Sequence, residues 1–303
     1  SGEPTLEFSK IVELTNFAHG LAGDRLIVEI QTNGVFSQKI AKWLSKNAKI
    51  VWISLDGPPE IQNILRPSSG KKDTAQIIER NIRILQEGGI NIQVGVRSTI
   101  TPVNLYRQIE MLDYFLGLGI RAIYSDPVFP PVGVDHQLPL DLSIGSDFNL
   151  EYAKQFLITR KYAETKGVFY GSIFTVNFDE KTEIFCRSCL PSPHLTTDGY
   201  VSCCDMSYLG NVLPELIYGK YDAETKTICY DKSKISAIRL RRASNLADCR
   251  NCEILYNCAG VCFGEGLNET GRLMGVKKDY CEAIRFLAHH LELNNGLYEY
   301  LHP

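Results

Sequence analysis

Cysteine is concentrated in the second half of the 303-residue chain, at spacings that indicate a set of metal ligands. Nine of the ten cysteines are candidate metal ligands: Cys186, Cys189, Cys203, Cys204, Cys249, Cys252, Cys258, Cys262 and Cys281. From Cys249 to Cys262 the pattern is C-x2-C-x5-C-x3-C. Thiolates hold iron–sulfur clusters, typically four per [4Fe–4S] unit, and they also form zinc sites. We favour iron–sulfur, because a zinc ribbon usually pairs two C-x2-C knuckles, whereas these cysteines interleave differently.

Composition excludes several other classes of protein. Hydrophobic residues make up 44% of the chain, charged residues 22%, and the formal net charge is −3. This balance predicts no nucleic-acid partner, and no apolar run approaches the roughly 18–20 residues that cross a bilayer. We therefore expect neither nucleic acid nor a membrane as a partner. Without a recognisable signal peptide the protein is expected in the cytoplasm, where a reducing environment favours metal ligation over disulfides.

The elements that must position these groups begin with an alternation of helices and strands. Apolar residues at helical spacing predict helices over 7–18, 35–47, 73–86 and 103–118. Short apolar runs predict strands over 26–30, 50–53, 92–96 and 122–124. Such alternation predicts an α/β fold with a parallel sheet and right-handed crossovers. In these folds the functional loops follow the strands' C-terminal ends, here at 32–34, 54–57, 97–99 and 125–126.

The second half of the chain has a different composition. Residues 130–147 are rich in Pro, Gly and Asp and are interpreted as a linker, and a helix is predicted over about 150–165. From Cys186 onward, short strands and turns dominate until a final helix over about 281–293. We therefore divide the chain into two domains, 1–170 and 171–303.

The cysteine pattern resembles the SPASM extension of radical SAM enzymes. The matching residues run from Cys186 through Gly199 to Cys204, then through the C-x2-C-x5-C-x3-C segment to Cys281. The resemblance implies two auxiliary [4Fe–4S] clusters. One would be held by Cys186, Cys189, Cys204 and Cys262, and the other by Cys249, Cys252, Cys258 and Cys281. Cys203 competes with Cys189 as the fourth ligand of the first cluster, and Cys229 lies outside the motif.

The N-terminal half carries a second resemblance to the same enzymes. Gly2, Glu3 and Pro4 are similar to the Gly-Gly-Glu-Pro motif that holds the amino group of S-adenosylmethionine, with Ser1 in place of the first glycine. Ser54-Leu-Asp-Gly-Pro58, followed by Arg66, resembles the family's fourth-strand signature. The resemblance makes Ser54 and Ser98 candidate contacts for the cofactor's ribose or carboxylate, and Arg66 a partner for that carboxylate. Alternatively, the two hydroxyls cap backbone groups and Arg66 ties down its own loop.

Asp205 is the candidate catalytic residue. It directly follows Cys204, and in relatives that mature sulfatases a carboxylate at this position acts as the base on the substrate side chain. A carboxylate can be tuned by its surroundings for that task. The alternative is that Asp205 caps a turn.

The resemblance implies a partial (β/α)6 radical SAM barrel followed by a Cys-rich SPASM domain. No cysteine precedes Cys186, so the C-x3-C-x2-C motif for the catalytic [4Fe–4S] cluster is absent. Together with the missing initiator methionine, this favours a fragment of a longer enzyme, which we expect to be inactive by itself. A natural lineage without radical chemistry is the alternative.

The function implied for the complete protein is that of a radical SAM oxidoreductase. It would use S-adenosylmethionine to generate a 5′-deoxyadenosyl radical and modify a side chain of a ribosomal peptide or protein, by oxidation, thioether formation or carbon–carbon cross-linking. A flavodoxin or ferredoxin would donate electrons. The alternatives are a non-catalytic peptide-binding scaffold with structural clusters, and a radical SAM enzyme that acts on a small molecule.

Overall fold

The computed structural model describes residues 2–68, 70, 72–88, 92–129 and 147–291. The chain forms two compact units. We call Gly2–Val128 with Lys154–Ile173 the sheet unit. The described part of the other unit, residues 129, 147–153 and 174–291, is called the cysteine unit. The predicted linker over 130–147 lies outside the described residues except for its last position.

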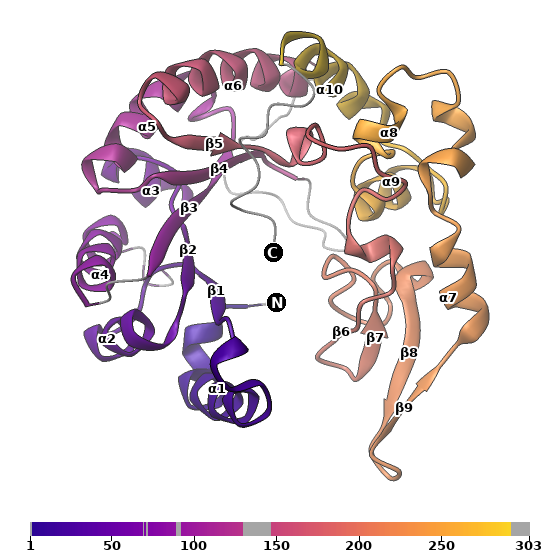
Figure 1. The fold of residues 1–303 in the computed structure, drawn as a ribbon, viewed down its shortest axis with the longest axis horizontal. Coiled ribbons are helices and arrows are strands. Elements are labelled where there is room, and N and C mark those ends of the chain that lie inside the picture. Colours follow the sequence, from indigo (N-terminus) through magenta and orange to yellow (C-terminus); the bar gives the residue numbers. More distant parts are fainter. Residues whose placement is uncertain (1, 69, 71, 89–91, 130–146, 292–303) are drawn as a thin grey trace. The chain divides into compact units, whose positions relative to one another are not determined.

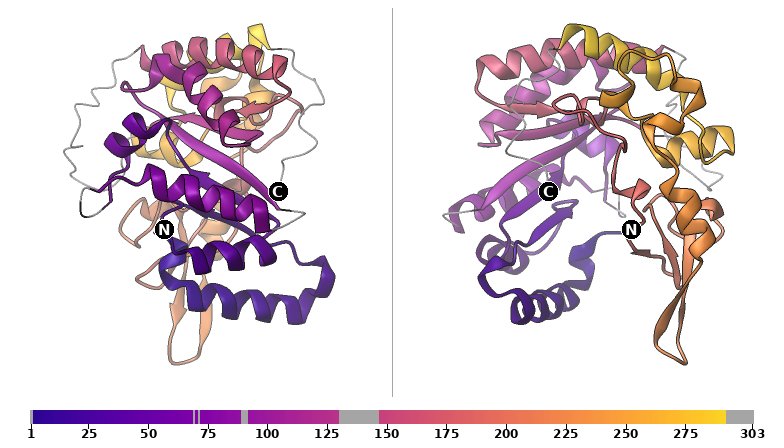
Figure 2. Two further views of the ribbon diagram at one scale, coloured as in Figure 1. Left: turned by 90° about the vertical axis from the view of Figure 1, so that its left-hand side faces the viewer. Right: turned by 45° about the vertical axis from the view of Figure 1, so that its right-hand side comes forward.

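The sheet unit is built on five parallel strands in the order β1-β2-β3-β4-β5. The strands are β1 Glu29–Thr32, β2 Ile50–Ser54, β3 Gln93–Ile100, β4 Ala122–Pro127 and β5 Phe169–Gly171. Its helices are α1 Phe8–Ala22, α2 Gln38–Asn47, α3 Pro59–Leu65, α4 Ala75–Gly88, α5 Gln108–Gly117 and, from Lys154 onward, α6 Phe148–Thr165. Figures 1 and 2 show α2 to α5 along one face of the sheet. The predicted parallel α/β architecture is confirmed.

The two faces of this sheet differ because side chains alternate along each strand. Val51, Ile53, Val96 and Ile123 are fully buried. Gly34, with φ +76°, lies just after β1, and a Cβ atom there would meet the side chains of Ile53 and of Ile78 on α4. Ile53 therefore lies on the face of the sheet that the helices cover. Ser54 pairs in register with Arg97, and Arg97 with Tyr124. These three residues therefore share the opposite face, which we call the inner face.

Several predicted element boundaries were wrong. β1 begins at Glu29, three residues later than predicted, and α3 was not predicted at all. β3 continues through Ser98 and Thr99, and β4 through Asp126, where the sequence predicted loops. The reason is that the ladder between β3 and β4 extends to Ile100 and Pro127, past the point where the apolar runs end. Polar residues can thus remain in a strand when a neighbouring strand supplies backbone partners.

The cysteine unit contains a four-stranded antiparallel sheet in the order β6-β7-β8-β9. The strands are β6 His194–Leu195, β7 Tyr200–Ser202, β8 Ile217–Asp222 and β9 Thr227–Tyr230. The helices that begin in this unit's C-terminal part are α7 Lys232–Arg239, α8 Leu255–Cys258, α9 Phe263–Thr270 and α10 Lys278–His290. The short strands and the final helix predicted for this region are confirmed.

Short 3-10 helices connect many of these elements. They are η1 Pro4–Glu7, η2 Gly23–Arg25, η3 Leu105–Arg107, η4 Ile173–Thr175, η5 Arg187–Cys189, η6 Pro214–Leu216, η7 Ala243–Asn245 and η8 Ala247–Cys249. None of the helices in the described ranges combines the length and apolarity needed to span a bilayer.

Candidate cofactor and metal sites

Glu3 fixes the N-terminal segment to the end of β1. Its Oε1 accepts hydrogen bonds from the Thr5 amide at 3.0 Å and from the Thr32 hydroxyl at 2.7 Å. Its Oε2 accepts from the Asn33 amide at 2.6 Å. Gly2 is exposed and Pro4 is half-buried. The structure therefore brings the Gly2–Pro4 segment to the predicted loop at residues 32–34, and the remaining acceptor capacity here suits an ammonium group.

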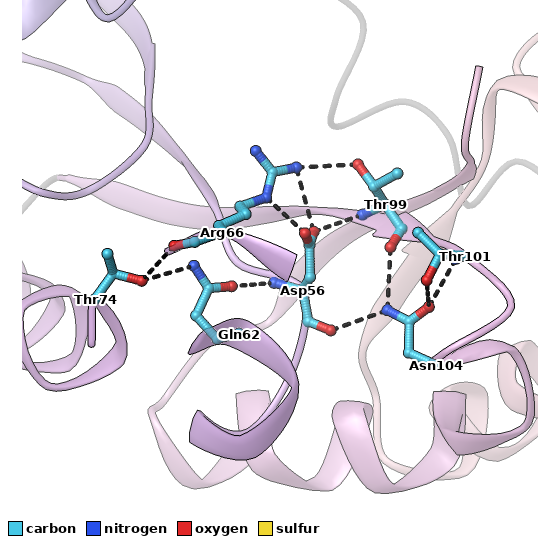
Figure 3. A network of polar contacts seen from close by, with 7 residues as sticks. All are labelled: Asp56, Gln62, Arg66, Thr74, Thr99, Thr101 and Asn104. Carbon is cyan, nitrogen blue, oxygen red and sulfur yellow. Dashed lines mark hydrogen bonds and ion pairs between the residues drawn. The ribbon is translucent and has the colours of Figure 1, made fainter. Parts of the chain in front are cut away.

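Arg66 lies in a network centred on buried Asp56 (Figure 3). Its Nε donates to Asp56 Oδ2 at 2.6 Å, and its Nη2 donates to Asp56 Oδ1 at 3.3 Å and to the Thr99 hydroxyl at 3.0 Å. The Thr99 amide also donates to Asp56 Oδ1, at 2.8 Å. These contacts join the loop after β2 to β3. They support the alternative that Arg66 ties down its own loop. Its Nη1 makes no hydrogen bond within the described residues.

The two candidate serines lie on opposite faces of the sheet. Ser54 ends β2 and pairs with Arg97, which places it on the inner face. Ser98 is the next residue after Arg97, so it lies on the helix-covered face, where it is 3% exposed. Its Oγ has no hydrogen-bond partner within the described residues. The structure therefore does not bring Ser54 and Ser98 to a common ligand-binding face.

The inner face carries polar groups that were not among the predicted site residues. Arg97 Nη1 donates to Gln31 Oε1 at 3.4 Å, its Nη2 lies 3.7 Å from Asp126 Oδ2, and its guanidinium lies 5.2 Å from the Tyr124 ring centroid. Burial raises the pKa of Asp126, against the lowering effects of the Ile173 amide and of Arg97. The available signal was that each of the two charged residues follows a predicted buried strand closely, Arg97 directly and Asp126 two residues later. Sequence reasoning had assigned both residues to loops.

The cysteine unit brings the predicted cluster ligands together in two groups. Electrostatic coupling joins Cys189 to Cys186, Cys204 to Cys262, and Cys262 to Cys186. A second set of couplings joins Cys249, Cys252, Cys258 and Cys281. These last four cysteines also line one cavity, together with Ile254, Val276 and Ile284 among others. We call the two sets the first and second sulfur groups.

The sulfur atoms lie in surroundings that favour a neutral thiol when no metal is bound. Burial raises the pKa of Cys204, Cys258 and Cys262 to about 12. Backbone amides oppose this effect: the Glu265 amide lowers the pKa of Cys262, and the Gly260 amide lowers that of Cys258. Such amides suit a sulfur that carries negative charge on a metal. All ten cysteines are free, and this donor chemistry fits iron–sulfur clusters.

The structure does not decide between Cys189 and Cys203 as the fourth ligand of the first cluster. Cys189 and Cys203 are both buried, and Cys203 couples electrostatically to Cys204, Cys189 and Cys186. Cys229 is exposed on β9. Within the described ranges, no three His, Cys, Asp or Glu side chains converge closely enough to hold a single metal ion as they stand.

Asp205 is exposed beside the first sulfur group. The Cys204 sulfur lies 3.7 Å from Asp205 Oδ1. An exposed carboxylate next to a candidate cluster ligand is accessible to a substrate side chain, so the geometry is compatible with the predicted role of base.

Comparison with known proteins gives no matching protein-family profile, but it gives several similar proteins. The chain is 33% identical to a cysteine-type anaerobic sulfatase-maturating enzyme of Clostridium perfringens over 141 residues, which are 44% of this chain and 37% of the relative. It is 22% identical to the radical SAM cyclopropyl synthase TigE of Paramaledivibacter caminithermalis over 99% of this chain and 61% of the relative. The chain thus spans less than two thirds of these two relatives.

Solved structures show the same fold. The structure of native anSMEcpe with bound AdoMet and Cp18Cys peptide matches 96% of this chain and 82% of that chain, with a TM-score of 0.72 and 18% identity. Streptococcus suis SuiB bound to precursor peptide SuiA matches 93% of this chain and 64% of that chain, with a TM-score of 0.61 and 16% identity. The chain is therefore a homologue of anaerobic sulfatase-maturating enzymes and other radical SAM enzymes, and it has the radical SAM/SPASM fold that its cysteine pattern predicted.

Proposed function

We propose that the protein is a radical SAM/SPASM enzyme that modifies a side chain of a peptide or protein. The observation that carries this proposal is that Cys249, Cys252, Cys258 and Cys281 line one cavity. These four thiols would be the ligands of one [4Fe–4S] cluster, and the four thiols of the first sulfur group would be those of another. Homology to radical SAM enzymes supports it. S-adenosylmethionine would supply, after one-electron reduction, the 5′-deoxyadenosyl radical that abstracts a hydrogen atom from the substrate.

The chain's own residues would bind and orient the cofactor. The Gly2–Pro4 segment, fixed to β1 through Glu3, would hold the ammonium group. Asp56 orients the Arg66 guanidinium and leaves Nη1 for the cofactor's carboxylate. Ser54, on the inner face, remains a candidate for the ribose. Ser98 has a buried hydroxyl without a described partner, but it would need a ligand on the helix-covered face.

The substrate is proposed to be a peptide. Structures of anSMEcpe contain Kp18Cys and Cp18Cys peptides, and a structure of SuiB contains its precursor peptide SuiA. In this protein Asp205 would accept a proton from the modified side chain, because it is exposed beside the first sulfur group. We propose a flavodoxin or ferredoxin as the electron donor and the cytoplasm as the location, since ten free cysteines need a reducing environment.

Metal analysis after anaerobic reconstitution with iron and sulfide tests the cluster assignment. Two [4Fe–4S] clusters predict about eight irons per chain, since each cluster holds four. Cys258→Ser in the second sulfur group is expected to reduce iron and sulfide by about half. Cys229→Ser, outside both groups, serves as the control and should leave them unchanged. Stoichiometric zinc without iron, or an equal effect of the two variants, would contradict the assignment.

The radical reaction needs a separate assay, because the two sulfur groups do not provide the third [4Fe–4S] cluster expected for cleavage of S-adenosylmethionine. The protein, reconstituted with iron and sulfide and supplied with S-adenosylmethionine, dithionite and a candidate peptide, is expected to form 5′-deoxyadenosine and a peptide of altered mass. Formation of neither product with a fully loaded protein would favour the peptide-binding scaffold. Turnover that is stimulated by a small molecule but not by peptides would favour a radical SAM enzyme that acts on a small molecule.

A further inference from the structure

Arg241 is a buried cation without an acidic partner among its described contacts. It follows α7 and is 1% exposed, and it is the largest of the fully buried side chains in the described residues. Its Nη1 donates to the Leu273 carbonyl at 2.9 Å and its Nη2 to the Gly260 carbonyl at 3.2 Å. The guanidinium also lies 4.8 Å from the Phe263 ring centroid. None of these three partners carries a negative charge.

These contacts do not balance the cost of burying the charge. Two neutral carbonyls and an aromatic ring stabilise a guanidinium, but removing an ion from water costs considerably more unless a counter-charge lies nearby. The Nε–H is also buried, and it has no hydrogen-bond partner within the described residues. A guanidinium remains protonated in proteins, so the charge cannot be avoided by losing a proton. The buried cation therefore requires an anion in its surroundings.

The groups that can supply negative charge around Arg241 are cysteines of both sulfur groups. Its Nη2 donates to the carbonyl of Gly260, which lies two residues from Cys258 of the second group and two from Cys262 of the first, and its guanidinium faces the ring of Phe263, the residue after Cys262. As thiols the cysteines are neutral. At neutral pH they carry negative charge when they bind a metal as thiolates.

We infer that Arg241 is a positioning residue that supplies the counter-charge for iron–sulfur clusters in both sulfur groups. The inference rests on the clusters of the proposed function. A [4Fe–4S] cluster with four thiolate ligands carries net negative charge, which increases when the cluster is reduced. Net charge and hydrogen bonds to the sulfurs set the reduction potential. A buried cation therefore stabilises cluster binding and favours the reduced form, and the free Nε–H is a donor left for a sulfur atom.

Three variants separate this role from a purely structural one. Arg241→Met removes the charge and the hydrogen bonds, Arg241→Gln removes the charge but keeps an amide donor, and Arg241→Lys keeps the charge. Arg272→Met is the matched control, because Arg272 is in the same unit but is 63% exposed and pairs with Asp248. The measurements are iron content, cluster reduction potentials by EPR-monitored titration, and the rise in melting temperature when the metal-free protein is loaded with clusters.

The inference predicts that both neutral variants shift the cluster potentials to more negative values and show a smaller rise in melting temperature on loading. Arg241→Lys should retain most of the parent's potentials, and Arg272→Met should match the parent. Loss of clusters from a neutral variant that still folds without metal also supports the role.

Unchanged potentials in the neutral variants would overturn the inference, as would equal shifts in Arg241→Lys and Arg241→Gln. Neutral variants that cannot fold even without metal would overturn it too, because a counter-charge is needed only when clusters are present. Failure of the parent protein itself to load iron would instead contradict the proposed function.

Discussion

At the scale of single residues, Asp56 shows how one carboxylate positions a candidate cofactor-binding side chain. The side chain of Asp56 is 3% exposed, and it accepts two hydrogen bonds from Arg66 and one from the Thr99 amide. Its backbone also takes part, since Gln62 accepts from its amide and Asn104 donates to its carbonyl. The network fixes the orientation of Arg66 before any ligand arrives. Preorganisation of this kind reduces the cost of ordering a side chain on binding.

Asp56→Asn is therefore expected to lower the free energy of unfolding by about 1–3 kcal/mol, because it leaves Arg66 without its charged partner. Urea unfolding followed by circular dichroism measures the change. Glu60→Gln is the control, because Glu60 pairs with Arg107 at the surface, where ion pairs contribute little to stability. Equal unfolding free energies for the two variants would show that the Asp56 network does not stabilise the fold.

At the scale of secondary structure, the inner face depends on the Trp52 ring of β2 lying over Gly95 of β3. Trp52 of β2 pairs in register with Gly95 of β3, and a Cβ atom at position 95 would overlap the Trp52 ring. The same ring contacts Tyr124 edge-on, with centroids 5.5 Å apart, and Tyr124 contacts Arg97. Gly95 therefore allows the aromatic row that supports the polar groups of the inner face.

Gly95→Ala should destabilise the protein by about 1–3 kcal/mol, because the added methyl group forces Trp52 or the strand to move. Gly117→Ala is the matched control: it lies at the end of α5, where an added Cβ meets nothing within 4 Å. Alanine also favours a helix over glycine, so the control should be neutral or slightly stabilising. Thermal unfolding of both variants tests the prediction, and a Gly95→Ala protein as stable as the control would contradict it.

The sequence predicted where strands occur better than where they end, because the last residues of β3 and β4 are polar. The run Ile50–Ile53 was sufficient to predict β2, because continuous apolar residues indicate burial on both faces. Ser98 and Asp126 were assigned to loops, since neither residue favours a strand, yet backbone pairing keeps both in the sheet. Cysteine spacing predicted a set of metal ligands, because ligand chemistry constrains the spacing, and the division into two groups came from the resemblance to the SPASM extension. The isolated Arg241 carried no such signal, because its significance depends on burial between distant segments.

At the scale of the whole molecule, the two units differ in what stabilises them. The sheet unit has an apolar core that includes Val51, Ile53, Val96 and Ile123. The core of the cysteine unit includes Cys189, Cys203 and Cys204 beside Val201, Leu216 and Phe263. Placing candidate metal ligands in a core links folding to protonation and metal binding. The cysteine unit without metal should therefore be the more sensitive part of the molecule to pH.

The sign of this pH dependence follows from the thiols of Cys204, Cys258 and Cys262. Burial raises their pKa to about 12 in the folded, metal-free protein, compared with about 8.5 in an unfolded chain. Above pH 8.5 the unfolded chain loses protons that the folded protein retains. The contribution of these thiols to stability is therefore fully present below pH 8.5 and is lost progressively as the pH rises toward 12.

Raising the pH from 8.5 to 9.5 should lower the free energy of unfolding of the metal-free protein by at most about 1 kcal/mol for each of these thiols. Urea unfolding at pH 7.5, 8.5 and 9.5 under anaerobic, reducing conditions measures the effect. Cys258→Ser removes one such thiol and should reduce the pH dependence, whereas Cys229→Ser should not, because Cys229 is exposed. A pH dependence that Cys258→Ser leaves unchanged would mean that this thiol titrates equally in the folded and unfolded states. Its surroundings would then not disfavour the thiolate, and metal binding would not be needed to stabilise it there.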